Sequence, residues 1–259
     1  MKKYLVLWLK MTSNSFQTIM SSRVGFLIFT FGKLLRFILY LGFIYFLFSG
    51  VKQIGQYSKN EILLFLLTFV FLGSIGQMFF REVYRFRSRI VSGDFDFDLL
   101  KPVNPIFRNL FGGFDLLDLL TMPLIIIALV KTLEGLHFEI WQLVLYLLLS
   151  VNCLLIIGSI HVLVLSFGVL KTEVDNAIMF YRDIETMGRF PVDIYKQPLR
   201  EILTFVIPVG VMFTVPAKVL LNLVSWPVII ISIVVGLLTF FFTQRFWVYA
   251  LKRYTSASS

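Results

Sequence analysis

Long apolar stretches constrain this chain more than any other feature of its sequence. A helix that crosses a lipid bilayer needs about 20 mostly apolar residues, and six stretches meet that requirement. They cover residues 24–49, 61–80, 115–133, 140–170, 199–216 and 226–250. Hydrophobic residues make up 58% of the 259 residues and charged residues only 15%, well below the roughly one quarter of a soluble domain. The sequence predicts an all-α integral membrane protein, with residues 1–259 forming one transmembrane domain.

Residues 1–22 have a different pattern. Tyr4, Trp8 and Met11 recur at spacings of three and four, while Lys3 and Lys10 fall on the opposite side. This arrangement is typical of an amphipathic helix with a basic polar face, which lies in the membrane interface.

Lysine and arginine residues divide unequally between the two sides of the six-helix arrangement. If both termini and the loops 81–113 and 171–198 share one side, twenty of the 24 basic residues lie there. The remaining four are Lys52, Lys59, Lys131 and Lys218. Basic residues gather on the cytoplasmic side of membrane proteins, so the sequence predicts cytoplasmic termini. The same bias explains the net charge of +9 without a nucleic-acid partner.

The basic loop 81–113 also has the character of a folded surface. Three alternating acids, Asp94, Asp96 and Asp98, are followed by the sequence Leu-Leu-Lys-Pro at 99–102. Acidic, apolar and helix-ending residues in one loop favour a surface that contacts another protein. A metal-dependent enzyme is the other interpretation of the acids, but on a helix they point in different directions and form no metal site.

Two prolines interrupt the fifth apolar stretch. Pro208 and Pro216 each remove a backbone donor and disturb the preceding helical turn. We expect Pro216 to end the span and residues 217–225 to turn back as a short re-entrant element near the outer face, sheltered from lipid. A kinked helix followed by an ordinary loop is the alternative.

Three ionisable residues inside the spans are candidates for a substrate path. Lys33 and Arg36 lie on one helical face; they either snorkel toward the inner headgroups, which we favour, or line an inward cavity for an anionic or amphipathic substrate. His161 either faces another helix as a functional group or only packs helices together. The acids Asp115 and Asp118 stand at a span's start, where the helix dipole favours them.

The sequence contains no nucleotide-binding P-loop, since Gly32-Lys33 lacks the other residues of that motif. Residues 91–105, Val-Ser-Gly-Asp-Phe-Asp-Phe-Asp-Leu-Leu-Lys-Pro-Val-Asn-Pro, resemble a loop of ABC type-2 transporter permeases, in particular of a bacterial six-span subfamily. A second similarity covers 190–195, 203–208 and 215–217, with its Pro-Val-Asp-Ile-Tyr, Leu-Thr-Phe-Val-Ile-Pro and Val-Pro-Ala segments.

The resemblance implies the type-2 ABC exporter fold and a permease subunit in the bacterial cytoplasmic (inner) membrane. A cytoplasmic coupling helix in the loop 81–113 is then expected to dock on a separate ATPase, with two ATPase copies and a second permease, identical or a sister chain. The chain itself binds no cofactor or metal and is not an enzyme; ATP and Mg²⁺ belong to the ATPase. The resemblance places the coupling contacts at Gly93, Phe95, Asp96, Phe97, Leu99, Leu100, Lys101, Pro102, Asn104 and Pro105.

The main alternative is a secondary, ion-coupled transporter without an ATPase partner. Such a carrier needs a functional carboxylate at half depth in the membrane. The sequence offers no obvious candidate, because its acids cluster at the ends of the apolar stretches.

Overall fold

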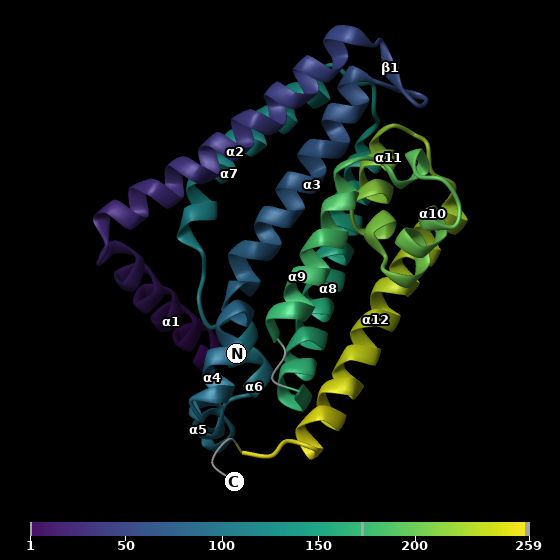
Figure 1. Cartoon of the computed structure of the whole chain (residues 1–259). Coiled ribbons are helices and arrows are strands. Elements are labelled where there is room, and N and C mark those ends of the chain that lie inside the picture. The colour runs from purple at the N-terminus through teal and green to yellow at the C-terminus, as the bar shows by residue number, and fades with distance from the viewer. Residues whose placement is uncertain (1, 172–173, 257–259) are drawn as a thin grey trace.

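The structure is a computed structural model that describes residues 2–171 and 174–256, and it is almost entirely helical (Figure 1). In chain order the α-helices are α1 (Lys2–Met20), α2 (Arg23–Gly50), α3 (Lys59–Phe80), α4 (Phe86–Val91), α5 (Asp94–Leu100), α6 (Pro105–Leu110), α7 (Leu116–Glu134), α8 (Ile140–Lys171), α9 (Val174–Thr186), α10 (Leu199–Glu201), α11 (Val215–Leu220) and α12 (Trp226–Lys252). Two short antiparallel strands, β1 (Gln53–Ile54) and β2 (Tyr57–Ser58), form a hairpin. We call the end that carries α5 the inner end, and the end that carries the hairpin the outer end.

Five helices are long and apolar enough to cross a membrane, namely α2, α3, α7, α8 and α12. They confirm the predicted spans at 24–49, 61–80, 115–133, 140–170 and 226–250 to within a few residues. The second of them is longer than predicted, because helical structure continues from Lys59 to Val91 as one rod of 33 residues. This rod joins the outer hairpin to the inner end without a sharp bend.

Helix α8 is the centre of the bundle and α2 lies at its edge. About 67% of the apolar window of α8 is buried inside the molecule, against 11% for α2. Helices α8 and α12 approach closely at Gly236, where a Cβ atom would collide with Asn152 Oδ1. The Asn152 amide donates to the Ser232 carbonyl oxygen at 2.9 Å and so ties the two helices together. The exposed apolar face of α2 has no partner within the described residues.

The predicted amphipathic helix at residues 1–22 is confirmed as α1. Its aromatic residues pack on the inner end, with Trp8 against Phe79 and Phe114, and Tyr4 against Phe107. Several other apolar residues of α1 are exposed, among them Leu5, Leu9 and Phe16, whereas Met11 is buried. A helix that packs on one side and exposes leucines on another is suited to the membrane interface.

The prediction that residues 171–198 form a cytoplasmic loop is wrong. Helix α9 runs beside α8 toward the outer end, with the Tyr181 and His161 rings 5.3 Å apart. The chain then reaches the outer hairpin, where the Tyr57 hydroxyl donates to Asp193 at 2.9 Å. Residues 174–193 therefore form a crossing. Hydropathy misses it because α9 contains four charged residues, two of which, Arg182 and Glu185, line a cleft.

The fifth predicted span, 199–216, is a re-entrant hairpin instead. Its two arms, Leu199–Val206 and Gly210–Leu220, meet at an angle of 76°. Arg200 from the first arm and Lys218 from the second both form ion pairs with Asp193, so both arms end at the outer side. The bend between them falls at Pro208, where proline removes a backbone donor.

The expectation that Pro216 ends the helix is also wrong. Pro216 stands in the first turn of α11, a position that tolerates proline because its N–H would have no partner there. The helix continues to Leu220, and a turn with Asn222 at φ 55° leads into α12. With residues 174–193 as a crossing, the described residues make six crossings, and α1 and the end of α12 lie at the same end (Figure 1).

Candidate functional site

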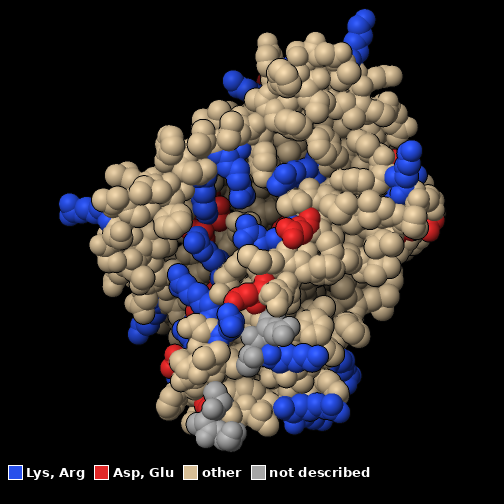
Figure 2. All heavy atoms as spheres, in the orientation of Figure 1, with Lys and Arg blue, Asp and Glu red and all other residues tan. Residues whose placement is uncertain are grey.

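A polar cleft lies inside the membrane-spanning bundle, between α2, α3, α7 and α9. Figure 2 shows lysine and arginine side chains gathered round a hollow in the middle of one face. The inner part of the cleft encloses about 250 Å³ and is lined by Lys33, Gln77, Arg81, Tyr84, Asp115 and Arg182. The deeper part encloses about 60 Å³, and Lys33 and Gln77 line both parts. The two parts are therefore direct neighbours.

Ion pairs occupy the inner wall of this cleft. Lys33 of α2 binds Asp115 and Asp118 at 2.8 and 2.7 Å. Asp115 is the N-cap of α7 and accepts from the Leu117 amide at 3.0 Å. A carboxylate is favoured there, because a helix N-terminus presents unpaired N–H groups and a partial positive charge. Arg81 pairs with the same Asp115. Lys33 thus lines the cleft, and the favoured expectation that it snorkels to the headgroups is wrong.

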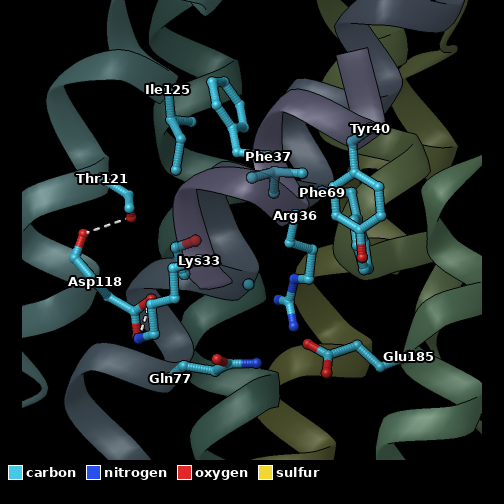
Figure 3. Close-up of a pocket in the computed structure, with 13 residues that line it drawn as sticks. Lys33, Arg36, Phe37, Tyr40, Phe69, Gln77, Asp118, Thr121, Ile125 and Glu185 are labelled. Atoms are coloured by element: carbon cyan, nitrogen blue, oxygen red, sulfur yellow. Dashed lines mark hydrogen bonds and ion pairs between the residues drawn. The ribbon is translucent and has the colours of Figure 1, made fainter. Parts of the chain in front are cut away.

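Three arginines in or beside the cleft have no ion pair. Arg36 points from α2 toward Glu185 of α9 (Figure 3). Arg189 lies over the rings of Tyr40 and Phe69, with its guanidinium carbon 5.0 and 6.0 Å from the ring centres. Arg182 lies 6.0 Å from the centre of the Tyr84 ring. In the described part of the chain, none of these three arginines has a carboxylate oxygen within 4.0 Å.

Sequence reasoning missed Glu185, Arg182 and Arg189 because it placed them in a cytoplasmic loop. Their spacing of three and four residues puts them on one helical face, and that pattern is the signal that could have revealed a buried polar face. The view that all the acids stand at span ends is corrected accordingly. Glu185 lines the deep part of the cleft together with Asp118.

His161 does not line the cleft. Its ring packs between Phe80 and Tyr181, and its Nδ1 lies 2.8 Å from the Ile157 carbonyl oxygen. Buried imidazole with an aromatic shell and a backbone partner is explained by helix packing. Of the three predicted substrate-path residues, the structure therefore brings together Lys33 and Arg36 and separates His161 from them.

The loop 91–105 forms a compact inner tip. Gly93 adopts φ 78°, which glycine accepts without strain, and this turn reverses the chain between α4 and α5. Phe95 is fully buried against Phe86 and Tyr254, with ring centres 5.1 and 5.2 Å away. Direct contact between Phe95 and an ATPase is therefore excluded in this conformation, which corrects one of the predicted coupling residues.

Other predicted coupling residues hold the inner tip together. The Asp96 carboxylate accepts from the Ser256 hydroxyl at 2.5 Å, and Lys101 binds the buried Asp98 at 3.2 Å. Asn104 caps α6, in which Pro105 is an early residue, by accepting from the Ile106 amide. The Pro102 carbonyl oxygen accepts from Lys3 of α1 at 2.7 Å.

The tip exposes an apolar patch. Leu100 is 81% exposed, and Val91, Phe97 and Leu99 are also exposed. Together these four residues form the inner apolar patch. Phe97, Leu99 and Leu100 are predicted coupling residues whose apolar side chains are exposed and so available to contact another molecule; Val91 was not among the predicted residues.

A second cavity, of about 590 Å³, lies at the outer end. It is enclosed by the two arms of the re-entrant hairpin and by the outer half of α12, and Asp193, Arg200 and Lys218 are among its lining residues. Pro208 forms the bend of this hairpin and Pro216 lies within one arm. A gating role for either proline stays a prediction.

A family model described as ABC-2 family transporter protein matches residues 34–258, a range that includes the inner tip, the re-entrant hairpin and every lining residue of the cleft except Lys33. Neither a curated protein nor a solved structure matches the chain.

Proposed function

Because the chain belongs to the ABC-2 family of transporter proteins, a family of membrane transport components, we propose that it is the permease subunit of an ABC exporter. Substrate passes through the polar cleft between α2, α3, α7 and α9. A separate ATPase docks on the inner tip and drives the transport cycle. ATP and Mg²⁺ are held by that ATPase, because this chain has no P-loop.

The inner apolar patch carries this proposal. A monomeric protein rarely exposes a contiguous cluster of large apolar side chains unless a partner covers it. Helix α5, which carries Phe97, Leu99 and Leu100 of the patch, lies at the inner end of the molecule (Figure 1). A few buried apolar anchors dominate the binding energy of such interfaces, and Leu100 and Phe97 are suited to that role.

The tip is joined rigidly to the cleft. The helical rod Lys59–Val91 runs from the tip along the cleft wall, where it contributes Gln77 and Arg81. The buried Phe95 also lies 6.3 Å, ring centre to ring centre, from Trp247 of α12. A push on the tip is thereby transmitted to two spans at once, which is the kind of rigid-body movement that alters access to a site.

The working unit contains two ATPases and a second permease, identical to this chain or a sister. The support is the poor burial of α2, only 11% of its apolar window, beside the open side of the cleft. A second permease on this face covers α2 and closes the cleft from the side.

The inner end faces the cytoplasm of a bacterial cell, with the protein in the inner membrane. The structure places Lys196 and Arg200 at the outer end, whereas the sequence predicted them on the cytoplasmic side. This difference reduces the excess of lysine and arginine at the inner end but does not reverse it. Most basic residues, including those of α1, the inner tip and the end of α12, remain at the inner end.

The test replaces apolar patch residues by aspartate in the full transporter. Leu100→Asp with Phe97→Asp should abolish co-purification of the ATPase and ATP-driven transport in proteoliposomes, while the permease still inserts. Ile140→Asp is the matched control, because Ile140 is 83% exposed but stands at the outer end. Unchanged co-purification and transport in the double variant would refute the proposal.

The ion-coupled carrier remains a second candidate because of one observation. Glu185 lies within the cleft, so the intramembrane carboxylate that such a carrier needs is present after all. Transport measured with either ATP or an imposed proton gradient separates the two functions. Uptake driven by the gradient without any ATPase would favour the carrier.

A further inference from the structure

The surroundings of Glu185, at the deep part of the cleft, hold more positive than negative charge. Arg36, Arg182 and Arg189 all act on the Glu185 carboxylate, whereas Asp118, the other carboxylate that lines the deep part, is paired with Lys33. Neither Arg36 nor Arg189 has an ion-pair partner in the described residues. By contrast, Lys33 and Arg81 at the inner wall are matched by Asp115 and Asp118. The surplus charge therefore belongs to the arginines around Glu185.

Arg36 lies within an apolar span. It is close to the middle of a helix of 28 residues, which places it about 20 Å from each helix end along the axis at the usual rise of 1.5 Å per residue. A cation within a span that has no ion-pair partner is costly in a bilayer, and such residues mark binding sites and transport paths.

Two buried polar atoms in this region have no hydrogen-bond partner. They are the Nε of Arg189, beside the cleft residues Tyr40 and Phe69, and the Oδ2 of Asp118. An N–H group that is buried without an acceptor costs free energy. An oxygen atom brought into the cleft by a ligand can satisfy the Arg189 donor.

The rim of the cleft is apolar on the α2 side. Leu35, Ile38 and Leu39 flank Arg36 in the sequence and are exposed on the outside of α2. Phe37 and Ile125 line the deep part beside the arginines. A ligand that occupies the cleft thus meets guanidinium groups at one end and hydrocarbon at the other.

From these observations we infer that the cleft binds an anionic amphiphile, whose phosphate or carboxylate group lies between Arg36 and Arg189 and whose alkyl tail lies along α2. Guanidinium groups suit this role because their planar fork of donors matches the oxygens of both anions. Glu185 opposes the bound anion and limits its affinity, which allows release. The inference rests on the proposed function, since it names the class of substrate that the exporter carries.

The experiment compares three ligands that share either the head or the tail. The full-length permease is placed in phosphatidylcholine nanodiscs, and binding of radiolabelled monododecyl phosphate is measured. Dodecylphosphocholine has the same tail with a zwitterionic head, and inorganic phosphate has the anion without a tail. We expect monododecyl phosphate to bind at least ten-fold more tightly than either of the other two.

Charge variants test the position of the anion. Arg36→Gln and Arg189→Gln should each weaken monododecyl phosphate binding about ten-fold, the effect of losing one charge-assisted hydrogen bond. Glu185→Gln should strengthen binding several-fold, because it removes a repulsive charge. Arg245→Gln is the matched control, since Arg245 is on α12 away from the cleft, and it should have no effect.

Three results would overturn the inference. Inorganic phosphate binding as tightly as monododecyl phosphate would show a site for a small anion, and equal binding of dodecylphosphocholine would show that the charge is not recognised. Weaker binding by Glu185→Gln would show that Glu185 holds the arginines in position and does not oppose the bound anion.

Co-purification with the ATPase is measured on the same variants. If it persists while anion binding is absent, this inference alone fails; if anion binding is found and no ATPase associates, the proposed function fails.

Discussion

Two clusters of arginine, lysine and carboxylate lie at different depths in this protein, and they are built differently. At the outer end, Asp193 binds Arg200 and Lys218 and accepts from the Tyr57 hydroxyl. In the cleft, Arg36 and Arg189 have no ion pair within the described residues. The outer cluster has all of its partners within the chain, whereas the cleft cluster is incomplete. This difference is consistent with a structural role for the first cluster, and it supports the proposal that the second binds a ligand.

The titration of the outer cluster agrees with a structural role. Burial opposes ionisation of Asp193, but the Lys218 ammonium and the Tyr57 hydroxyl outweigh it and hold the pKa of Asp193 below its ordinary value. Burial raises the pKa of Tyr57 to about 12. Each group is thereby kept in the form that the hydrogen bond requires, a charged acceptor and a neutral donor.

The largest expected effect concerns the side of the membrane on which the outer cluster lies. Single cysteines at Lys196, Lys59 and Arg87, in a Cys153→Ser background, should label in an all-or-none manner. The structure predicts that Lys196 and Lys59 react from one side and Arg87 from the other. A membrane-impermeant maleimide on intact cells measures this. If the cysteine at position 196 instead reacted from the same side as the cysteine at position 87, residues 171–198 would be cytoplasmic and the outer cluster would not lie on the outer side.

The next effect is on stability. Asp193→Asn leaves Lys218 and Arg200 without a counter-charge, and removing one partner of a largely buried pair costs about 3 kcal/mol. Thermal unfolding in detergent should show this loss, together with release of the re-entrant hairpin. Asp175→Asn is the matched control, because Asp175 pairs with Arg87 on the exposed surface. Such pairs contribute less than about 1 kcal/mol. Equal losses in the two variants would contradict a locking role for Asp193.

These two clusters also show what the sequence could predict. Five spans and the helix at residues 1–22 follow from apolar runs and periodicity, because burial in lipid requires them. The sixth crossing could not be found in the same way, since Arg182, Glu185 and Arg189 are polar residues that face a cleft rather than lipid. The re-entrant hairpin is apolar enough to imitate a span, and only the shared contact with Asp193 reveals that both of its ends lie on one side. Of the candidate site, Lys33 and Arg36 were predicted from their position in an apolar run, whereas their partners depended on a tertiary arrangement.

Substitutions in the cleft should have a smaller effect on the free energy of unfolding. Lys33 and Arg36 lie one turn apart on α2, but only Lys33 has ion-pair partners. Lys33→Gln leaves Asp115 and Asp118 less well paired and should destabilise the protein by about 2 kcal/mol. Arg36→Gln removes no ion pair, so its free energy of unfolding should change by less than about 1 kcal/mol. Urea or thermal unfolding of both variants measures the contrast, and a larger loss for Arg36→Gln would show that its partner lies within the chain.

The smallest effect is the pH dependence of the outer cluster. Asp193 has a lowered pKa in the folded protein, so its contribution to stability is fully present above the unfolded value of about 3.9. That contribution is lost as the pH falls through the lower folded value. Tyr57 has a raised pKa, so its contribution is fully present below about pH 10 and is lost as the pH rises toward 12. The stability difference between the wild type and Asp193→Asn should therefore be constant from about pH 5 to pH 9 and shrink below about pH 4. Tyr57→Phe, measured in the same way, should differ from the wild type by about 1 kcal/mol on that plateau, with the difference shrinking above about pH 10. Arg36→Gln supplies the comparison with the cleft, since it removes neither Asp193 nor Tyr57 and should leave both of these pH limits where they are in the wild type.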